Sequence, residues 1–410
     1  MASGHRLKQH RLFALMGPAF IAAIAYVDPG NVAANITAGA RYGYLLVWVL
    51  VLSNIAAMLV QYLSAKLGIV TGQSLPALLG SRLRPRNRIL FWLQAELVAA
   101  ATDLAEVIGG AIALNLLFGI PLLWSGVIIG AASIVILLFQ GRRQNIFEAV
   151  IIGMLVVITA GFLAGLFFAP PQWSQVASGL IPRFKGSDSI LVAASMLGAT
   201  VMPHAIYLHS SLVNDHHTDP EVERPHKRAL LRATRHDILW ALSIAGIVNI
   251  GLLLLAASAL SGVEGTDTIE GAYHAIAHAL GPTVSTIFAL GLLASGLAST
   301  SVGAYAGSEI MNGLLHVNVP LLARRLVTII PALIILGMGA EPTWALVLSQ
   351  VALSFGIPFA IVPLMRLTRS KEVMGEYANK PLTITVASVI AAAIILLNIL
   401  LAYLTITGQG

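Results

Sequence analysis

Two short stretches of this chain place metal-ligating residue types beside a proline in runs that are otherwise apolar. The first, AIAYVDPGNVAAN, covers residues 23–35 and contains Asp28 and Asn31; the second, GATVMPHAIYLHS, covers residues 198–210 and contains Met202. An ionised carboxylate in hydrocarbon is costly, and a proline removes a backbone hydrogen bond from its helix. Because packing alone would not favour such residues in a membrane helix, both stretches predict a functional role.

Together the two stretches offer a mixed set of ligands for a cation. Asp28 and Asn31, three residues apart, supply a charged and a neutral oxygen from one part of the chain. The proline after Met202 frees the carbonyl of Ala199 one turn earlier, and Met202 itself carries a thioether. Mg²⁺ and Ca²⁺ prefer shells of oxygen alone, whereas one sulfur among oxygens favours a first-row transition metal. The alternative for Met202 is plain packing, since methionine commonly fills apolar cores.

The elements that must hold these residues are apolar runs long enough to cross a membrane. A spanning helix needs about 20 mostly apolar residues, whereas the strands of a membrane barrel are shorter and alternate in polarity. The chain is 57% hydrophobic and only 10% charged, whereas soluble proteins carry about 25% charged residues. We therefore expect an all-α polytopic membrane protein. Its eleven predicted spans lie near residues 12–38, 44–71, 89–118, 121–140, 146–169, 188–213, 237–262, 283–313, 320–340, 342–366 and 382–407.

Lysine and arginine are strongly biased to one side of this predicted topology. When the loops are assigned alternately to the two sides, only Arg41, Arg183 and Lys185 of the 24 basic residues fall opposite the N-terminus. Cytoplasmic loops are the ones enriched in basic residues, so the bias predicts a cytoplasmic N-terminus in a cell (inner or plasma) membrane. The charge is spread over short loops, which excludes a nucleic-acid-binding surface.

The two proline breaks lie five spans apart, in the first and the sixth span. An odd number of spans gives the two halves opposite orientations, so we predict an inverted repeat. Its halves are residues 12–169 and 188–366, with an eleventh helix at 382–407 appended, all within one transporter domain of residues 1–410. Broken helices at corresponding positions of two such halves indicate a transporter whose binding site lies at the membrane midplane.

Three acidic residues follow one face of the predicted third span. Asp103 lies about 20° around the helix from Glu96, and Glu106 about 60° from Asp103. A row of acids inside a membrane helix predicts a proton or ion path. The alternative is structural pairing with Arg324 and Arg325, which begin the ninth span. The two interpretations are compatible, and we favour a path through Asp103 and Glu106 but not Glu96, which lies nearer the cytoplasmic end.

Two further polar residues belong to the candidate site. His204 follows the second proline directly, and an imidazole that titrates near neutral pH suits a proton relay. We favour that role over direct metal ligation and over a simple buried hydrogen bond. Gln350 interrupts the tenth span, where a hydrogen bond between helices is the usual explanation. A part-time metal contact is the second interpretation for Gln350.

The motif DPGN in the first span and MPH in the sixth span together resemble the Nramp family of proton-coupled divalent transition-metal transporters. The resemblance covers nearly the whole chain, including the eleven spans and the inverted repeat. It implies a LeuT-like fold and import of Mn²⁺ or Fe²⁺ coupled to proton entry. It also implies that Asp28, Asn31, Met202 and the Ala199 carbonyl are the metal ligands. The implied proton route leads from Asp28 past His204 to the acids and arginines of the third and ninth spans.

The main alternative is a LeuT-like sodium-coupled amino-acid symporter. Such a protein needs sodium ligands from carbonyls and hydroxyls rather than an Asp and a Met at the breaks. We do not expect an enzyme, because the sequence has neither a His-Glu-x-x-His motif nor a P-loop. The expected partners are the metal ion, protons and the lipid bilayer, with no obligatory protein partner. The metal is expected as substrate, and no cofactor is expected.

Overall fold

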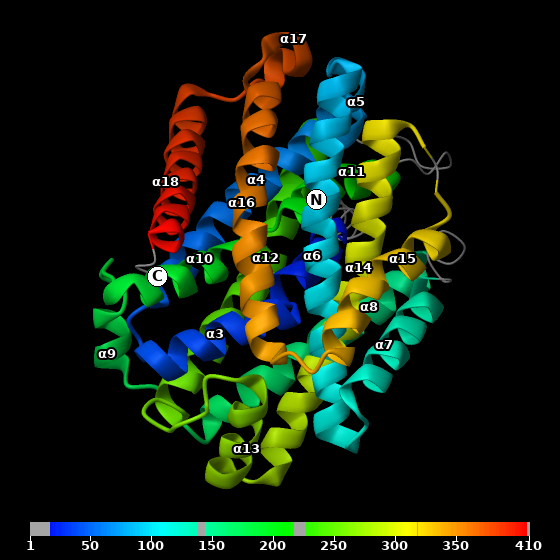
Figure 1. Cartoon of the computed structure of the whole chain (residues 1–410). Helices are drawn as coiled ribbons and strands as arrows, with labels where there is room; N and C mark the ends of the chain where they lie inside the picture. The colour runs from blue at the N-terminus through cyan, green and yellow to red at the C-terminus, as the bar shows by residue number, and fades with distance from the viewer. Residues whose placement is uncertain (1–16, 138–143, 217–226, 318, 408–410) are drawn as a thin grey trace, which may run out of the picture.

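The computed structural model describes residues 17–137, 144–216, 227–317 and 319–407, and every regular element within these ranges is a helix (Figure 1). The predicted start of the first span, at residue 12, lies outside the described residues. The elements are α2 (Pro18–Ile24), η1 (Ala25–Val27), α3 (Pro29–Tyr42), α4 (Val47–Thr71), α5 (Leu75–Arg82), α6 (Pro85–Phe118), α7 (Leu122–Leu137), α8 (Gln144–Leu163), η2 (Ala164–Phe167), α9 (Trp173–Ser178), α10 (Gly186–Thr200), α11 (Pro203–His216), α12 (Lys227–Ala259), α13 (Ile269–Leu280), α14 (Pro282–Leu315), α15 (Leu321–Gly337), α16 (Pro342–Arg369), α17 (Lys371–Met374), η3 (Gly375–Tyr377) and α18 (Pro381–Ile406).

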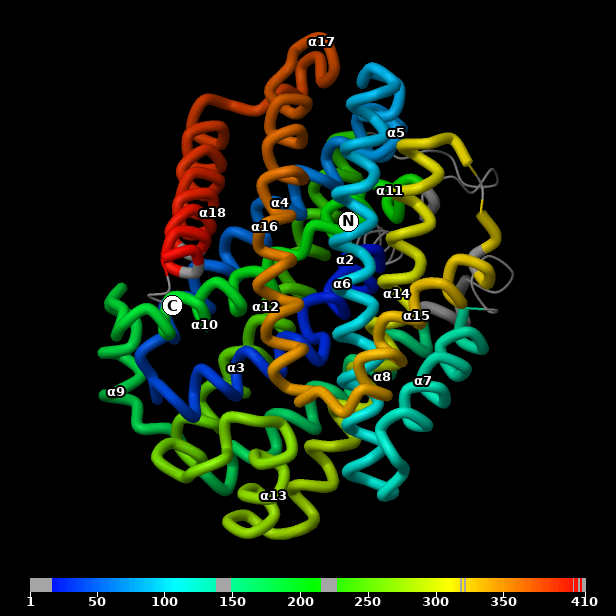
Figure 2. Tube along the Cα trace, in the orientation of Figure 1, coloured from blue at the N-terminus to red at the C-terminus, as the bar shows by residue number. Residues whose placement is uncertain are grey.

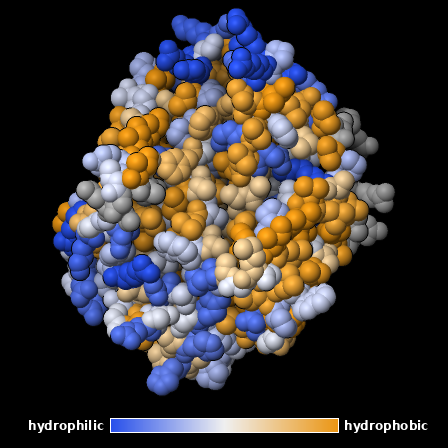
Figure 3. Space-filling view, viewed as in Figure 1, coloured by the Kyte–Doolittle hydropathy of each residue, from blue (hydrophilic) through white to orange (hydrophobic). Residues whose placement is uncertain are grey.

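The helices match the predicted spans in order and position, which confirms the all-α membrane class. Among the described residues, eight helical stretches are long and apolar enough to cross a membrane, and the bent pair formed by α2–η1 and α3 makes a ninth. The two other predicted spans correspond to the shorter helices α7 and α15. Large apolar side chains such as Leu97, Trp124 and Ile247 are more than half exposed. Figure 3 shows apolar residues across the middle of the molecule and hydrophilic ones near its ends.

Both predicted helix breaks are present. The first span bends by 46° between Val27 and Pro29. In the sixth span, α10 ends at Thr200 and α11 begins at Pro203, with Val201 in a non-helical conformation between them. The prolines end the hydrogen-bond ladder because they lack a backbone N–H.

The longer helices pack around the two broken spans. α14 packs along α6 and α8, α12 packs along α3 and α4, and α16 packs between α10 and α6. Most residues of α3 and α10 are buried, whereas Figure 2 shows α18 at the outer edge of the bundle. Small residues permit the close contacts: a Cβ added to Gly296 of α14 would lie 2.7 Å from the Cα of Gly110 in α6. Such small-residue contacts are typical of membrane helix packing.

Candidate metal site

The sequence DPGN forms a helix start in the middle of the protein. Asp28 is the N-cap residue of α3, and its Oδ1 accepts a hydrogen bond of 2.8 Å from the backbone N–H of Asn31. Pro29 occupies the first turn, where a missing N–H costs nothing. The residues that appear unfavourable for a membrane helix are therefore those that begin a new one. The start of α3 also directs its partial positive charge toward the Asp28 carboxylate.

Three of the predicted ligands come together between the two breaks. The Asn31 amide Nδ2 donates to Asp28 Oδ1 at 2.7 Å and to the carbonyl oxygen of Ala199 at 2.8 Å. Both Asp28 and Asn31 are fully buried. Within the described part of the chain, Asp28 Oδ2 and Asn31 Oδ1 have no hydrogen-bond partner. Buried oxygens without partners are rare because they are costly, so this pair offers ligand atoms for a cation.

Met202 lies at the second break and is fully buried in the main hydrophobic core. It is the last residue before α11, three residues after Ala199. Among the described residues, no group of three or more His, Cys, Asp or Glu could hold a metal. The predicted ligand set requires none, because it combines one carboxylate with an amide, a carbonyl and a thioether.

Gln350 packs directly against the first break. A Cβ added to Gly30 would lie 1.8 Å from Gln350 Nε2, so the Gln350 side chain occupies the space that a larger residue at this position of α3 would need. On the other side, a Cβ at Gly198 would lie 2.0 Å from the Gln350 carbonyl. The Gln350 amide donates to Ser349 at 3.4 Å, in its own helix rather than a neighbouring one. Its Oε1 has no partner in the described ranges. The structure thus places Gln350 beside both broken helices.

Side chains from two other helices bind the carbonyls that the first break exposes, and sequence reasoning missed them. Asn249 of α12 donates to the Tyr26 carbonyl at 2.6 Å, and Ser295 of α14 donates to the Val27 carbonyl at 2.6 Å. Asn249 also accepts from Asn35 at 3.0 Å. A polar Asn within the apolar run IVNIGLLLL was a usable signal. Ser295 offered none, because serine is frequent throughout α14.

His204 connects the second break to α6. Its Nδ1 lies 3.3 Å from the Thr102 hydroxyl, and its Nε2 has no partner among the described residues. A second buried chain, also missed, joins His209 Nδ1 to Gln61 Oε1 at 2.7 Å and Gln61 Nε2 to the Tyr26 hydroxyl at 2.5 Å. The first contact connects α11 to α6, and the second chain connects α11 through α4 to Tyr26, just before the first break.

The acids of α6 differ in how they are paired. Arg325 donates to Asp103 at 2.6 Å and to the Ser133 hydroxyl at 3.0 Å, all three buried. Arg324 donates to Glu96 at 2.7 Å, so the acid left out of the predicted path forms an ion pair.

Glu106 is fully buried, and neither of its carboxylate oxygens has a hydrogen-bond partner in the described part of the chain. It packs against Gly303 of α14, where an added Cβ would lie 2.7 Å from Glu106 Oε2. The alternative interpretation, pairing with an arginine, therefore holds for Asp103 and Glu96 and, among the described residues, not for Glu106.

The helical breaks and the buried polar site define a membrane protein with the fold of LeuT-type transporters. The fold is shared with Mhp1, a nucleobase-cation-symport-1 family transporter in a closed conformation, at a TM-score of 0.51 and 17% identity over 96% of this chain and 93% of that chain. A family model described as natural resistance-associated macrophage protein-like (Nramp) matches residues 19–404. The chain belongs to the Nramp family.

Relatives in the family are similar over almost their full length. A divalent metal cation transporter MntH from Mycobacterium tuberculosis is 57% identical over 395 residues, covering 96% of this chain and 92% of that protein. The Bacillus subtilis MntH is 47% identical over 396 residues, covering 95% and 92%. The crystal structure of the Eremococcus coleocola manganese transporter has a TM-score of 0.84 and 33% identity, covering 96% of this chain and 86% of that chain.

Proposed function

We propose that this protein imports Mn²⁺ or Fe²⁺ through a cell membrane and couples import to proton entry. One observation carries the proposal: Asp28, Asn31 and the Ala199 carbonyl meet between two broken helices. The relatives support it, since they are named divalent metal cation transporters and one solved structure is of a manganese transporter. The metal is the substrate, and the cycle needs no cofactor and no obligatory protein partner.

In this proposal the ion binds Asp28, Asn31, the Ala199 carbonyl and the Met202 thioether. The Asn31 amide now donates to both Asp28 and Ala199. An amide carries its donor and acceptor on opposite sides, so a half-turn would present Oδ1 to the ion and release both acceptors. Gln350, which lies against Gly30, would supply a further oxygen during part of the cycle.

Protons would follow the buried polar chain away from the metal. Asp28 is the first acceptor, and His204 leads toward α6 through its contact with Thr102. Asp103 and Glu106 continue the path, with Arg324 and Arg325 lowering the cost of buried negative charge. A path of this kind uses groups that can exist both charged and neutral inside the protein.

The proposed cycle needs two halves that move against each other. We take residues 12–169 and 188–366 as inverted repeats, each starting with a broken span, and residues 382–407 as an appended helix. Movement of the broken spans would open the site first to the outside and then to the cytoplasm, where we place the N-terminus. The sodium-coupled amino-acid symporter has less support, because an Asp and a Met at the breaks are unsuited to its substrates.

Uptake of Mn²⁺ into proteoliposomes tests the proposal through Asp28→Asn. This change keeps the side-chain shape and the cap but removes the charge, and we expect uptake to fall at least about 100-fold, since even outer partners of metal sites are worth 10- to 100-fold. The exposed Asp188 gives a matched control, Asp188→Asn, which should transport normally. Normal Mn²⁺ uptake by Asp28→Asn would refute the proposed site.

A further inference from the structure

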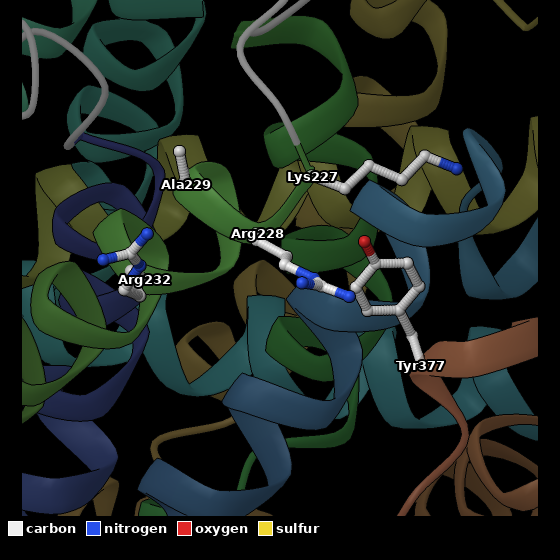
Figure 4. Close-up of a pocket in the computed structure, with 5 residues that line it drawn as sticks. All are labelled: Lys227, Arg228, Ala229, Arg232 and Tyr377. Atoms are coloured by element: carbon white, nitrogen blue, oxygen red, sulfur yellow. The ribbon is translucent and has the colours of Figure 1, made fainter.

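A basic pocket lies at the start of α12, far from the metal site in the sequence and not used by the proposed cycle. It is lined by Lys227, Arg228, Ala229, Arg232 and Tyr377, and its volume is about 550 Å³ (Figure 4). Figure 4 shows the Arg228 side chain extending toward the Tyr377 ring, while Arg232 lies one turn further along α12. The pocket is thus formed by the first turns of α12 and the η3 segment before α18.

The positive charge of this pocket is only weakly compensated. Arg228 lies 3.3 Å from Glu376, but both side chains are more than 60% exposed, and such surface pairs contribute little. Lys227 donates to the Val70 carbonyl at 2.8 Å, which fixes the lysine against the end of α4. Within the described ranges, Arg232 has no ion pair. The pocket therefore presents guanidinium groups suited to binding a phosphate.

The exposed side of α12 shows where the pocket lies relative to the bilayer. Leu239 follows Arg232 by seven residues, on nearly the same face of the helix, and it is 41% exposed. Trp240 is 63% exposed and Ile247 is 58% exposed. The face thus changes from arginine to apolar side chains within about 10 Å, with a Trp at the boundary. This pattern is typical of the headgroup level of a membrane.

We propose that this pocket binds the headgroup of an anionic phospholipid. The phosphate would contact Arg228 and Arg232, with the Tyr377 hydroxyl and Lys227 at the edge of the pocket, and an acyl chain would lie along Leu239. Free phosphate would use the basic groups but gain nothing from the apolar surface below them. The bound lipid would connect the start of α12 to the segment that joins α16 to α18.

Native mass spectrometry of the full chain in a neutral detergent tests this site with phosphatidylglycerol and phosphatidylcholine as probes. We expect phosphatidylglycerol to bind and Arg228→Gln/Arg232→Gln to weaken that binding about tenfold or more, given about 1 kcal/mol for each basic residue at a membrane surface. The control is Arg84→Gln/Arg86→Gln, which removes the same charge from two exposed arginines at the start of α6 and should leave binding unchanged.

Three outcomes would overturn the proposal. Equal loss in the two double variants would show general attraction to basic charge, and no loss in either would exclude this pocket. Displacement of the lipid by millimolar inorganic phosphate would identify a free-phosphate site instead. The altered arginines are exposed, and such surface changes usually alter stability little. Elution of each variant as a single folded species verifies this before binding is measured.

Discussion

At the scale of single residues, the site depends on buried polar atoms left without protein partners. Asp28, Asn31, Gln350, His204 and Glu106 each keep at least one such atom in the described part of the chain. A buried polar atom without a hydrogen bond costs roughly 1–3 kcal/mol, so such atoms at the two breaks and on α6 are available to bind an ion that the protein does not itself supply. We interpret these atoms as the groups that bind metal ions and protons during transport.

Glu106→Gln separates proton movement from metal binding. Among the described residues Glu106 forms no ion pair with an arginine, unlike Asp103, so its replacement by the isosteric amide breaks none there. We expect Mn²⁺ uptake to persist while proton influx falls about tenfold or more, as for loss of a proton-transfer group. In proteoliposomes with Mn²⁺ added outside, an enclosed pH-sensitive dye measures proton influx, and an enclosed metal-sensitive dye in a parallel sample measures Mn²⁺ uptake.

The matched control is Glu264→Gln, because Glu264 is exposed in the connection between α12 and α13. Its proton influx should equal that of the unaltered protein. Unchanged proton influx in Glu106→Gln would remove Glu106 from the path.

At the scale of elements, the breaks are held by helices that contribute no ligand. Asn249 of α12 and Ser295 of α14 bind the carbonyls exposed ahead of Asp28. Asp237 of α12 accepts from the backbone N–H groups of Gly17 and Ala19 at 3.1 and 3.0 Å and so holds the start of α2. The half of the broken span that precedes the bend therefore has defined contacts with α12 and α14, which a moving helix must exchange during transport.

Gly109→Ala tests how closely α6 must approach the break. A Cβ at Gly109 would lie 1.9 Å from Pro29 Cβ, so the backbone of the break would have to shift. Overpacking of this kind costs about 1–3 kcal/mol, and we expect a lower Tm and slower Mn²⁺ uptake. Gly153→Ala in α8 is the control, because no atom lies within 4 Å of its added Cβ. Equal Tm values for both variants would contradict this packing.

At the scale of the whole molecule, the sequence was sufficient for the class, the order of helices and both breaks. Long apolar runs predict the membrane spans, and prolines within them predict the breaks, from local sequence alone. The DPGN and MPH motifs together indicated the Nramp family. The contacts of Gln61, Ser295 and Thr102 could not be predicted, since each depends on which helices pack together. That Glu106 forms no ion pair within the described part of the chain was missed for the same reason: helical spacing gives a shared face but not the distance to an arginine on another helix.

The orientation in the membrane can be tested directly because the chain has no cysteine. Asn87→Cys at the start of α6 and Ser174→Cys in α9 introduce single thiols at exposed positions on the two predicted sides. In intact cells, a membrane-impermeant maleimide should label only Ser174→Cys if the N-terminus is cytoplasmic. Labelling of Asn87→Cys alone would reverse the proposed topology.

The central claim is that a divalent transition metal is held between the two broken helices, and Met202→Ala tests it most directly. Uptake of Mn²⁺ and of Ca²⁺ into proteoliposomes should be measured side by side for this variant and the unaltered protein. We predict that the variant admits Ca²⁺ and keeps part of its Mn²⁺ uptake, because an all-oxygen site no longer favours the softer ion. Full Mn²⁺ uptake with Ca²⁺ still excluded would show that Met202 only packs, and would contradict the account.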